Sequence, residues 1–299
     1  MIPDEPIDYS ESLQVVSAIN FDIGEGPIWD MSANRLICVD CNYGHIYLLD
    51  LDTGKFTLKE IDQTIGIALP CENGGLVVTS GDGLLYCNKE GEVSLVVPIE
   101  ADLKANRMND GKCDSRGRLW TGTFSKDFKR DAGSLYRIDP DLSVRKMLGD
   151  IRVSNGIAWN KNETLMYFND TLSGGVDVFD YDVNYGTLSN RRRFVDIKRE
   201  EGLPDGLTVD VEGCVWVALF YGGEVRRYNT EGILVGVVKL PVSRVTSCNF
   251  GGKNLTDLFI TTADFKIDDD GRPHEPEAGY VFKCQPGVQG LRSYPFGKK

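Results

Sequence analysis

Three polar side chains of different kinds lie close together in the segment NRMNDG, which begins at Asn106. Arg107 is a cation, Asn109 an amide and Asp110 a carboxylate, and a glycine follows at once. A guanidinium and an amide can hold the oxygens of a substrate, whereas a carboxylate can bind a metal ion or accept a proton. An isolated surface turn could carry the same residues, so the elements around the segment must decide between the two interpretations.

Those elements are short strands. The chain consists largely of β-branched and aromatic runs such as RLICVD, LMYFND and VDVFDYD, separated by Gly, Asn and Asp. Long stretches with helical periodicity are lacking. This pattern is typical of an all-β protein.

One unit recurs along the chain: a polar or small residue, a small residue, an apolar pair, a turn and a strand. Its small residue stands at positions 26, 66, 111, 156, 206 and 248, at intervals of 40 to 50 residues, and a second hairpin fills each interval. Four strands per repeat of this length indicate a propeller blade. We therefore expect residues 1–299 to form a single six-bladed β-propeller with a central metal site. A strand at 13–18 should complete the last blade beside GYVFKC and GLRSYPF.

Equivalent repeat positions should converge on the axis of the ring. The residue before the small residue is, in order, Glu25, Ile65, Asp110, Asn155, Asp205 and Ser247. A single Asp-Gly or Asn-Gly is more often a hairpin turn, but four oxygen-bearing side chains in register favour a ligand set. Such oxygens suit a hard divalent cation, and the lack of His in these units disfavours a His-based zinc site.

Composition narrows the choice of partners and location. The formal net charge of −12 disfavours nucleic acid and anionic membranes. The chain has no apolar run of membrane-spanning length, and its acidic start does not resemble a signal peptide. Most of the eight cysteines lie in apolar runs, which predicts reduced thiols and a cytoplasmic protein.

Several motifs resemble the SMP-30/gluconolactonase/luciferin-regenerating family over nearly the whole chain. They are GEGPIW (24–29), RMNDGKCDSRGRLWTGT (107–123), SNGIAW (154–159), LPDGLTVD (203–210) and TSCNFGGKNL (246–255). The resemblance implies a six-bladed propeller with one divalent metal in its channel. It assigns the metal to Glu25, Asn155 and Asp205, and it leaves Asp110 a supporting role.

The same resemblance assigns substrate contacts. Arg107 and Asn109 match the family's substrate-binding Arg and Asn. Asp127 is the nearest candidate for an acidic residue that meets the sugar in a following loop. This chain has Phe124 where the family pattern has Met, and its loop is shorter, so substrate preference is the property that can differ.

The resulting hypothesis is a metal-dependent lactonase that opens a sugar lactone such as gluconolactone. Ca²⁺ is the expected cofactor, with Zn²⁺, Mn²⁺ or Mg²⁺ as alternatives, and Asp205 both binds the metal and accepts a proton from water. The chain lacks a G-x-S-x-G motif. Two other functions stay open: hydrolysis of a phosphotriester or another ester, and calcium-dependent regulation without essential catalysis. We expect a monomer or weak dimer. The acidic segment 266–277 resembles an EF-hand loop only superficially, and we expect a solvated turn there.

Overall fold

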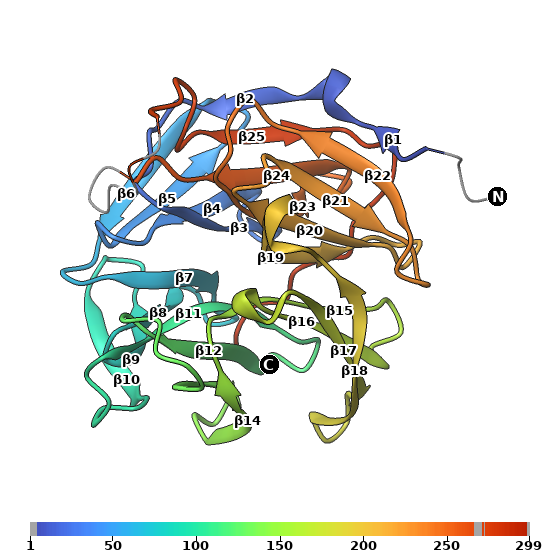
Figure 1. Ribbon diagram of the computed structural model, residues 1–299. Helices are drawn as coiled ribbons and strands as arrows, with labels where there is room; N and C mark the ends of the chain where they lie inside the picture. The colour runs from blue at the N-terminus through green and yellow to red at the C-terminus, as the bar shows by residue number, and fades with distance from the viewer. Residues whose placement is uncertain (1–4, 266–270, 272, 298–299) are drawn as a thin grey trace.

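Six β-sheets stand as blades around a common centre in the computed structural model, which describes residues 5–265, 271 and 273–297 (Figure 1). Within each blade the strands follow one another in antiparallel order, so consecutive strands are neighbours. The six-bladed β-propeller predicted from the repeats is confirmed. The part of the chain described here contains short 3-10 turns but no α-helix.

The strand bounds follow the predicted repeat. Blades 1 to 3 are formed by β3 (Gly24–Asp30), β4 (Arg35–Asp40), β5 (His45–Asp50), β6 (Lys55–Glu60); β7 (Ile65–Pro70), β8 (Leu76–Ser80), β9 (Gly83–Cys87), β10 (Val93–Pro98); and β11 (Asn106–Cys113), β12 (Leu119–Ser125), β13 (Gly133–Ile138), β14 (Val144–Ile151). Blades 4 to 6 are formed by β15 (Ser154–Trp159), β16 (Leu165–Asp170), β17 (Gly175–Asp182), β18 (Thr187–Asp196); β19 (Leu203–Val209), β20 (Val215–Phe220), β21 (Glu224–Tyr228), β22 (Leu234–Lys239); and β23 (Val245–Gly251), β24 (Asp257–Thr262), β25 (Val281–Cys284), β2 (Gln14–Ser17). The short elements are β1 (Ile7–Asp8), η1 (Ser10–Ser12), η2 (Thr171–Ser173) and η3 (Arg199–Glu201).

The two ends of the chain close the ring. β2 pairs with β25, so the outermost strand of blade 6 comes from the N-terminal end, as the sequence predicted. β1 adds a short parallel pairing to β22 of blade 5. Figure 1 shows these first strands lying beside the last ones of the chain.

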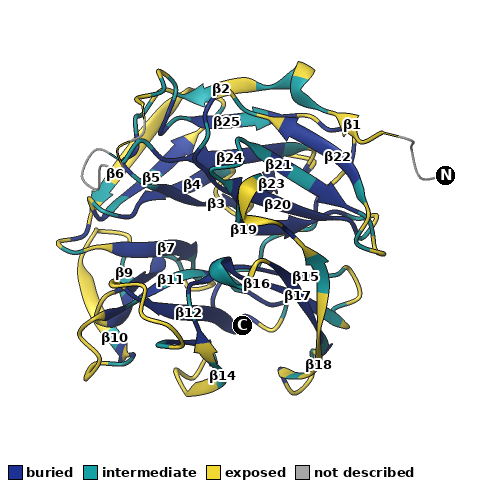
Figure 2. Cartoon of the chain, in the orientation of Figure 1, coloured by how far each residue is buried: buried dark blue, intermediate teal, exposed yellow. Residues whose placement is uncertain are grey.

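Most innermost strands are buried, and most outermost strands are largely exposed (Figure 2). Every residue of β3 and β15 is buried, whereas most of β18 is exposed. The four tryptophans, at positions 29, 120, 159 and 216, are all buried. Two of them also donate their indole N–H to a buried aspartate, Trp120 to Asp114 and Trp216 to Asp210, each at 2.9 Å.

The C-terminal segment departs from the prediction. The run GLRSYPF (290–296) does not form a strand of the last blade, although Gly290 N–H donates to the Leu255 carbonyl there. The segment also bonds to three other blades: Leu291 N–H donates to Val209, Phe296 N–H to Pro70, and the N–H of the next residue, Gly297, to Gly117. The segment therefore crosses the end of the channel where the innermost strands finish.

All eight cysteines are free, and seven of them are buried. Within the described ranges, no helix has the length and apolar character of a membrane span. Half of the acidic segment 266–277, including Lys266, Asp268 and Asp270, lies outside the described residues, so the expected turn there stays a prediction.

Candidate active site

A β-bulge marks the start of the innermost strands at the predicted site. The pairing of β11 with β12 shifts between Met108 and Gly111, so Asn109 and Asp110 lie in the bulge. The same shift occurs after Ser154 in β15 and after Pro204 in β19, and it places Asn155 and Asp205 in equivalent bulges. A bulge re-aims the side chains of a strand. The repeated feature detected in the sequence is thus a repeated bulge at one end of the channel.

The glycine that follows each site residue is explained by the approach of the next blade. A Cβ atom on Gly156 would lie 2.6 Å from the carbonyl oxygen of Asp205, and one on Gly206 would lie 2.0 Å from Ser247 Oγ. Cβ atoms do not approach other atoms so closely. The glycines therefore let neighbouring innermost strands come together, and this brings the preceding side chains to a common centre.

The structure brings three carboxylates into electrostatic contact there. Burial, and next the charge of Asp110, raise the pKa of Glu25 to about 8. Burial together with Glu25 and Asp110 raises the pKa of Asp205 well above its usual range, and Asn155 lies close enough to oppose the shift. The three groups come from blades 1, 3 and 5. Burial is the largest cause of the raised pKa of each of the three carboxyls.

Two buried oxygens at this centre have no hydrogen-bond partner, Asn155 Oδ1 and Asp205 Oδ1. Their residues are only 4% and 6% exposed. The amide nitrogen of Asn155 donates to Thr171 Oγ1 at 3.1 Å, so its carbonyl oxygen is directed elsewhere. Buried polar atoms without partners are costly, and an oxygen-bound cation satisfies both atoms and offsets the carboxylate repulsion. The set Glu25, Asn155 and Asp205 therefore fits the divalent metal predicted for it.

The predicted substrate residues lie around this centre. The Arg107 guanidinium lies 4.6 Å from the centre of the Phe124 ring and is close enough to Glu25 to lower the pKa of that carboxyl. Asn109 donates its amide to the Ser154 carbonyl at 2.9 Å, which fixes its orientation against blade 4. Asp127 is exposed in the loop after β12. Substrate contact stays a prediction for all three.

One buried cation was missed from the sequence. Lys112 follows Asp110 by two residues and so shares its side of β11. Its Nζ donates to the Leu207 carbonyl at 3.0 Å. Burial lowers the pKa of Lys112, Asp110 opposes that shift, and Lys112 in turn restrains the rise in the pKa of Asp110. The period-2 spacing of Asp110 and Lys112 was the signal for it.

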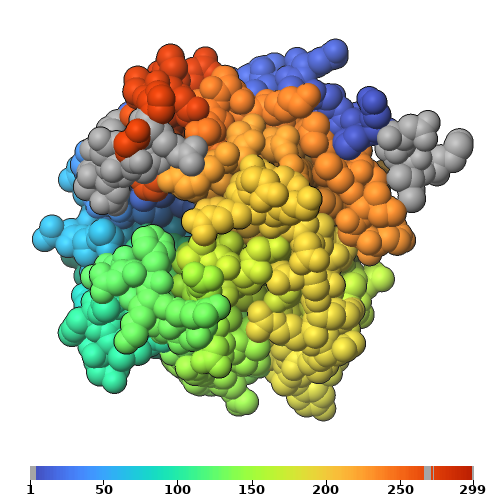
Figure 3. Space-filling model, viewed as in Figure 1, coloured from blue at the N-terminus to red at the C-terminus, as the bar shows by residue number. Residues whose placement is uncertain are grey.

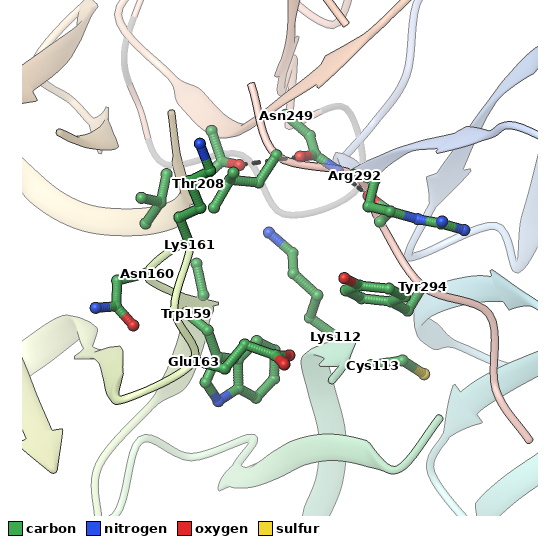
Figure 4. Close-up of a pocket in the computed structure, with 14 residues that line it drawn as sticks. Lys112, Cys113, Trp159, Asn160, Lys161, Glu163, Thr208, Asn249, Arg292 and Tyr294 are labelled. Atoms are coloured by element: carbon green, nitrogen blue, oxygen red, sulfur yellow. Dashed lines mark hydrogen bonds between the residues drawn. The ribbon is translucent and has the colours of Figure 1, made fainter. Parts of the chain in front are cut away.

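Lys112 also lines a cavity of about 180 Å³ at the opposite end of the channel from the bulges. Figure 4 shows its ammonium directed across the opening between blades 3, 4 and 5. The C-terminal segment forms one wall with Arg292, Ser293 and Tyr294. The predicted metal ligands do not line this cavity, so it is separate from the candidate active site.

A second acidic group has a structural explanation. Atoms of Asp210, Glu212 and Cys214 lie within 4.8 Å of one another. Arg227 already neutralises them, since its Nη2 lies 2.7 Å from Asp210 and 2.6 Å from Glu212. Burial raises the pKa of Cys214 to about 11, so its thiol keeps its proton. We interpret this group as an ion-pair network that supports blade 5.

Comparisons with known proteins agree with the geometry. The model of the SMP-30/Gluconolactonase/LRE-like region matches residues 23–264. Regucalcin from Gallus gallus and from Homo sapiens are each 36% identical over 295 residues, which cover 96% of this chain and 99% of theirs.

Solved structures extend the comparison. A luciferin-regenerating enzyme superposes with a TM-score of 0.90 at 30% identity, over 96% of this chain and 99% of its own. A calcium-binding regucalcin from Agrobacterium tumefaciens superposes with a TM-score of 0.91 at 26% identity, over 99% and 100% of the two chains. A gluconolactonase from Xanthomonas campestris, 20% identical with a TM-score of 0.74 over 91% of this chain and 89% of its own, shares the fold. The chain thus belongs to the SMP-30/gluconolactonase/luciferin-regenerating family.

Proposed function

We propose that the protein is a divalent-metal-dependent lactonase that opens aldonolactones such as gluconolactone. The observation that carries the proposal is the pair of buried, unpartnered oxygens of Asn155 and Asp205 beside the carboxyl of Glu25. Membership of a family named for gluconolactonase supports a lactone as substrate. The oxygen-only ligand set and the calcium-binding relative support Ca²⁺.

When bound by Glu25, Asn155 and Asp205, the cation would supply Lewis-acid polarisation of the lactone carbonyl. Asp205 would take a proton from the attacking water at its carboxylate. Arg107 and Asn109 would hold ring oxygens at the mouth, and the fixed amide of Asn109 pre-orients that contact.

The protein's partners are then small molecules, and we infer neither nucleic-acid nor membrane binding. Eight free cysteines support a cytoplasmic location.

Gluconolactone hydrolysis by chelated protein, before and after addition of Ca²⁺, Zn²⁺, Mn²⁺ or Mg²⁺, tests the proposal. Lactones open spontaneously, so Asp205→Asn protein supplies the matched background rate. We expect chelation to remove the enzymatic rate and one ion to restore it. Full activity after chelation would show that the metal is not required.

The same assay separates the alternatives. Tight Ca²⁺ binding without turnover of any lactone would favour the regulatory function. Turnover of a phosphotriester or simple ester but not of lactones would favour the other hydrolase activity.

A further inference from the structure

Arginine and phenylalanine side chains form the same pair on two blades at the mouth of the channel. Arg107 lies three residues before Asp110, and its guanidinium stacks over Phe124 at 4.6 Å. Arg244 lies three residues before Ser247, the equivalent repeat position, and stacks over Phe265 at 5.5 Å. Blades 3 and 6 are three steps apart in a ring of six, so the two pairs face each other across the channel.

Both pairs lie at the end of the channel that holds the predicted metal ligands. Arg107 in β11 pairs directly with Phe124 in β12, and Leu203 at the start of β19 pairs with Phe220 at the end of β20. The second strand of each blade therefore ends where its innermost strand begins. The loops that follow β12 and β20, and the residues directly after β24, therefore lie at the same end of the channel as the bulges.

Three aromatic residues in these loops adopt left-handed backbone conformations. The φ angles are +51° for Phe128, +65° for Tyr221 and +53° for Phe265. This conformation is unfavourable for bulky side chains and is often retained for function. The ring centres of Phe128 and Phe124 are 5.8 Å apart, but Phe128 remains 59% exposed. Burial of its side chain therefore does not offset the energetic cost of this backbone conformation. Beside the second arginine pair, the ring centre of Phe220 lies 4.4 Å from that of Tyr221 and 5.6 Å from that of Phe265.

These side chains make a continuous path from the carboxylates to the surface on blade 3. Glu25 is in electrostatic reach of Arg107, Arg107 stacks on Phe124, and Phe124 stacks on Phe128. In Figure 3 the green segments near residue 130 and the gold segment near residue 200 lie on the same face of the molecule. A ligand whose reacting carbonyl lies at the centre has its distal part beside the exposed ring of Phe128.

We infer that this aromatic collar selects lactones that carry an aryl substituent over lactones without one. The inference rests on the lactonase chemistry of the proposed function, and it makes aryl-substituted lactones, rather than free aldonolactones, the preferred substrates. Aromatic rings prefer offset or edge-on packing against other rings, and phenylalanine offers no hydroxyl for a sugar. The substituent would cover the exposed surface of Phe128, while the lactone ring stays between Arg107 and Asn109.

The test compares kcat/KM for an aryl-substituted butyrolactone and for unsubstituted butyrolactone in wild type, Phe128→Ala and Phe128→Leu. We expect the aryl preference to fall about five- to thirtyfold in Phe128→Ala, because over half of a phenylalanine surface is then lost to the ligand. Phe128→Leu keeps an apolar contact but has no ring, so its aryl preference should lie between those of wild type and Phe128→Ala. Phe56→Ala is the control, since Phe56 is 51% exposed on β6, an outermost strand, and should leave the ratio unchanged.

The backbone bonds of the loop do not depend on the ring: Lys126 N–H donates to Ala105 and Phe128 N–H to Ser125, so the variants should fold. A ratio unchanged in Phe128→Ala, or an equal loss for both lactones, would overturn the collar while leaving the lactonase proposal intact. If wild type opens neither lactone, the aryl hydroxy acid serves as a ligand in thermal melts. Stabilisation of wild type but not of Phe128→Ala would then support the collar without the proposed activity, and equal or absent stabilisation would overturn it.

Discussion

Glu25→Gln should stabilise the metal-free protein and destabilise the metal-loaded one relative to wild type. Folding raises the pKa of Glu25 from 4.5 to about 8, mainly through burial. A carboxyl with a raised pKa binds its proton more tightly in the folded state, so folding stability falls as the pH rises from 4.5 toward 8. Each pH unit in that window costs about 1.4 kcal/mol. Glutamine does not titrate, so at pH 7 the free energy of unfolding of the metal-free variant should exceed that of wild type by about 3 kcal/mol. This difference corresponds to a melting temperature higher by roughly 6 °C.

Saturating metal should reverse this order. A ligand present at a thousandfold excess over its Kd stabilises the folded state by about 4 kcal/mol. The variant should bind the metal less tightly because it has lost one of the two negative charges among its three proposed ligands. The assay is thermal unfolding at pH 5 and 7, in chelator and in Ca²⁺. The gain in chelator should be small at pH 5, where little of the titration has occurred.

The control is Glu163→Gln. Glu163 accepts hydrogen bonds from the backbone and hydroxyl of Ser115, far from the predicted ligands, and should show no reversal with Ca²⁺. A Glu25→Gln protein that is less stable than wild type in chelator at pH 7, with an undiminished response to Ca²⁺, would refute both the burial argument and the ligand assignment.

Three further predictions concern the same site. Metal affinity should fall as the pH drops below 8, because the metal must displace a proton from Glu25 and from Asp205. The fall should be about tenfold per pH unit for each proton displaced. A metal affinity that does not change with pH in calorimetric titrations would exclude these carboxyls as ligands. Arg107→Ala should leave metal affinity unchanged or slightly tighter. Its kcat/KM for the lactone should fall about 10- to 150-fold, because a charge-assisted hydrogen bond to the substrate is lost. Weaker metal binding with an unchanged KM would contradict a substrate role for Arg107. Gly156→Ala should lower both the melting temperature and the metal affinity, because the new Cβ would lie 2.6 Å from the Asp205 carbonyl oxygen. The control Gly149→Ala should change neither property, since its Cβ would meet only the flexible end of Lys146 at 3.4 Å. Equal melting temperatures for the two variants would show that Gly156 does not set the spacing between the strands.

The sequence predicted the repeated framework well because its signal is local and periodic. The glycine after Asn155 and Asp205 recurs since each blade must approach the next, and that constraint acts at the same place in each repeat. The side chains before the glycines could therefore be assigned to one centre without a structure.

Features that break the repeat could not be predicted in the same way. The run GLRSYPF has the composition of a strand, yet it pairs with no strand of the last blade, and its backbone bonds are spread over several blades. Periodicity in the sequence does not encode such an arrangement. The stack of Phe128 on Phe124 depends on a loop conformation rather than on spacing. Lys112 was detectable only by extending the alternation of β11 beyond Asp110.

The closure of blade 6 constrains how the protein can be made. Ser17 in β2 pairs with Val281 in β25, so β2 finds its partner strand only after more than 260 further residues have been synthesised. At about 5–20 residues per second the delay is on the order of 10–50 s. Throughout that interval β2 is an unpaired strand, and the nascent chain exposes an edge that can pair with another copy. We expect deletion of the residues through Ser17 to leave the outer edge of β25 permanently unpaired, and so to give the folded protein a persistent tendency to aggregate.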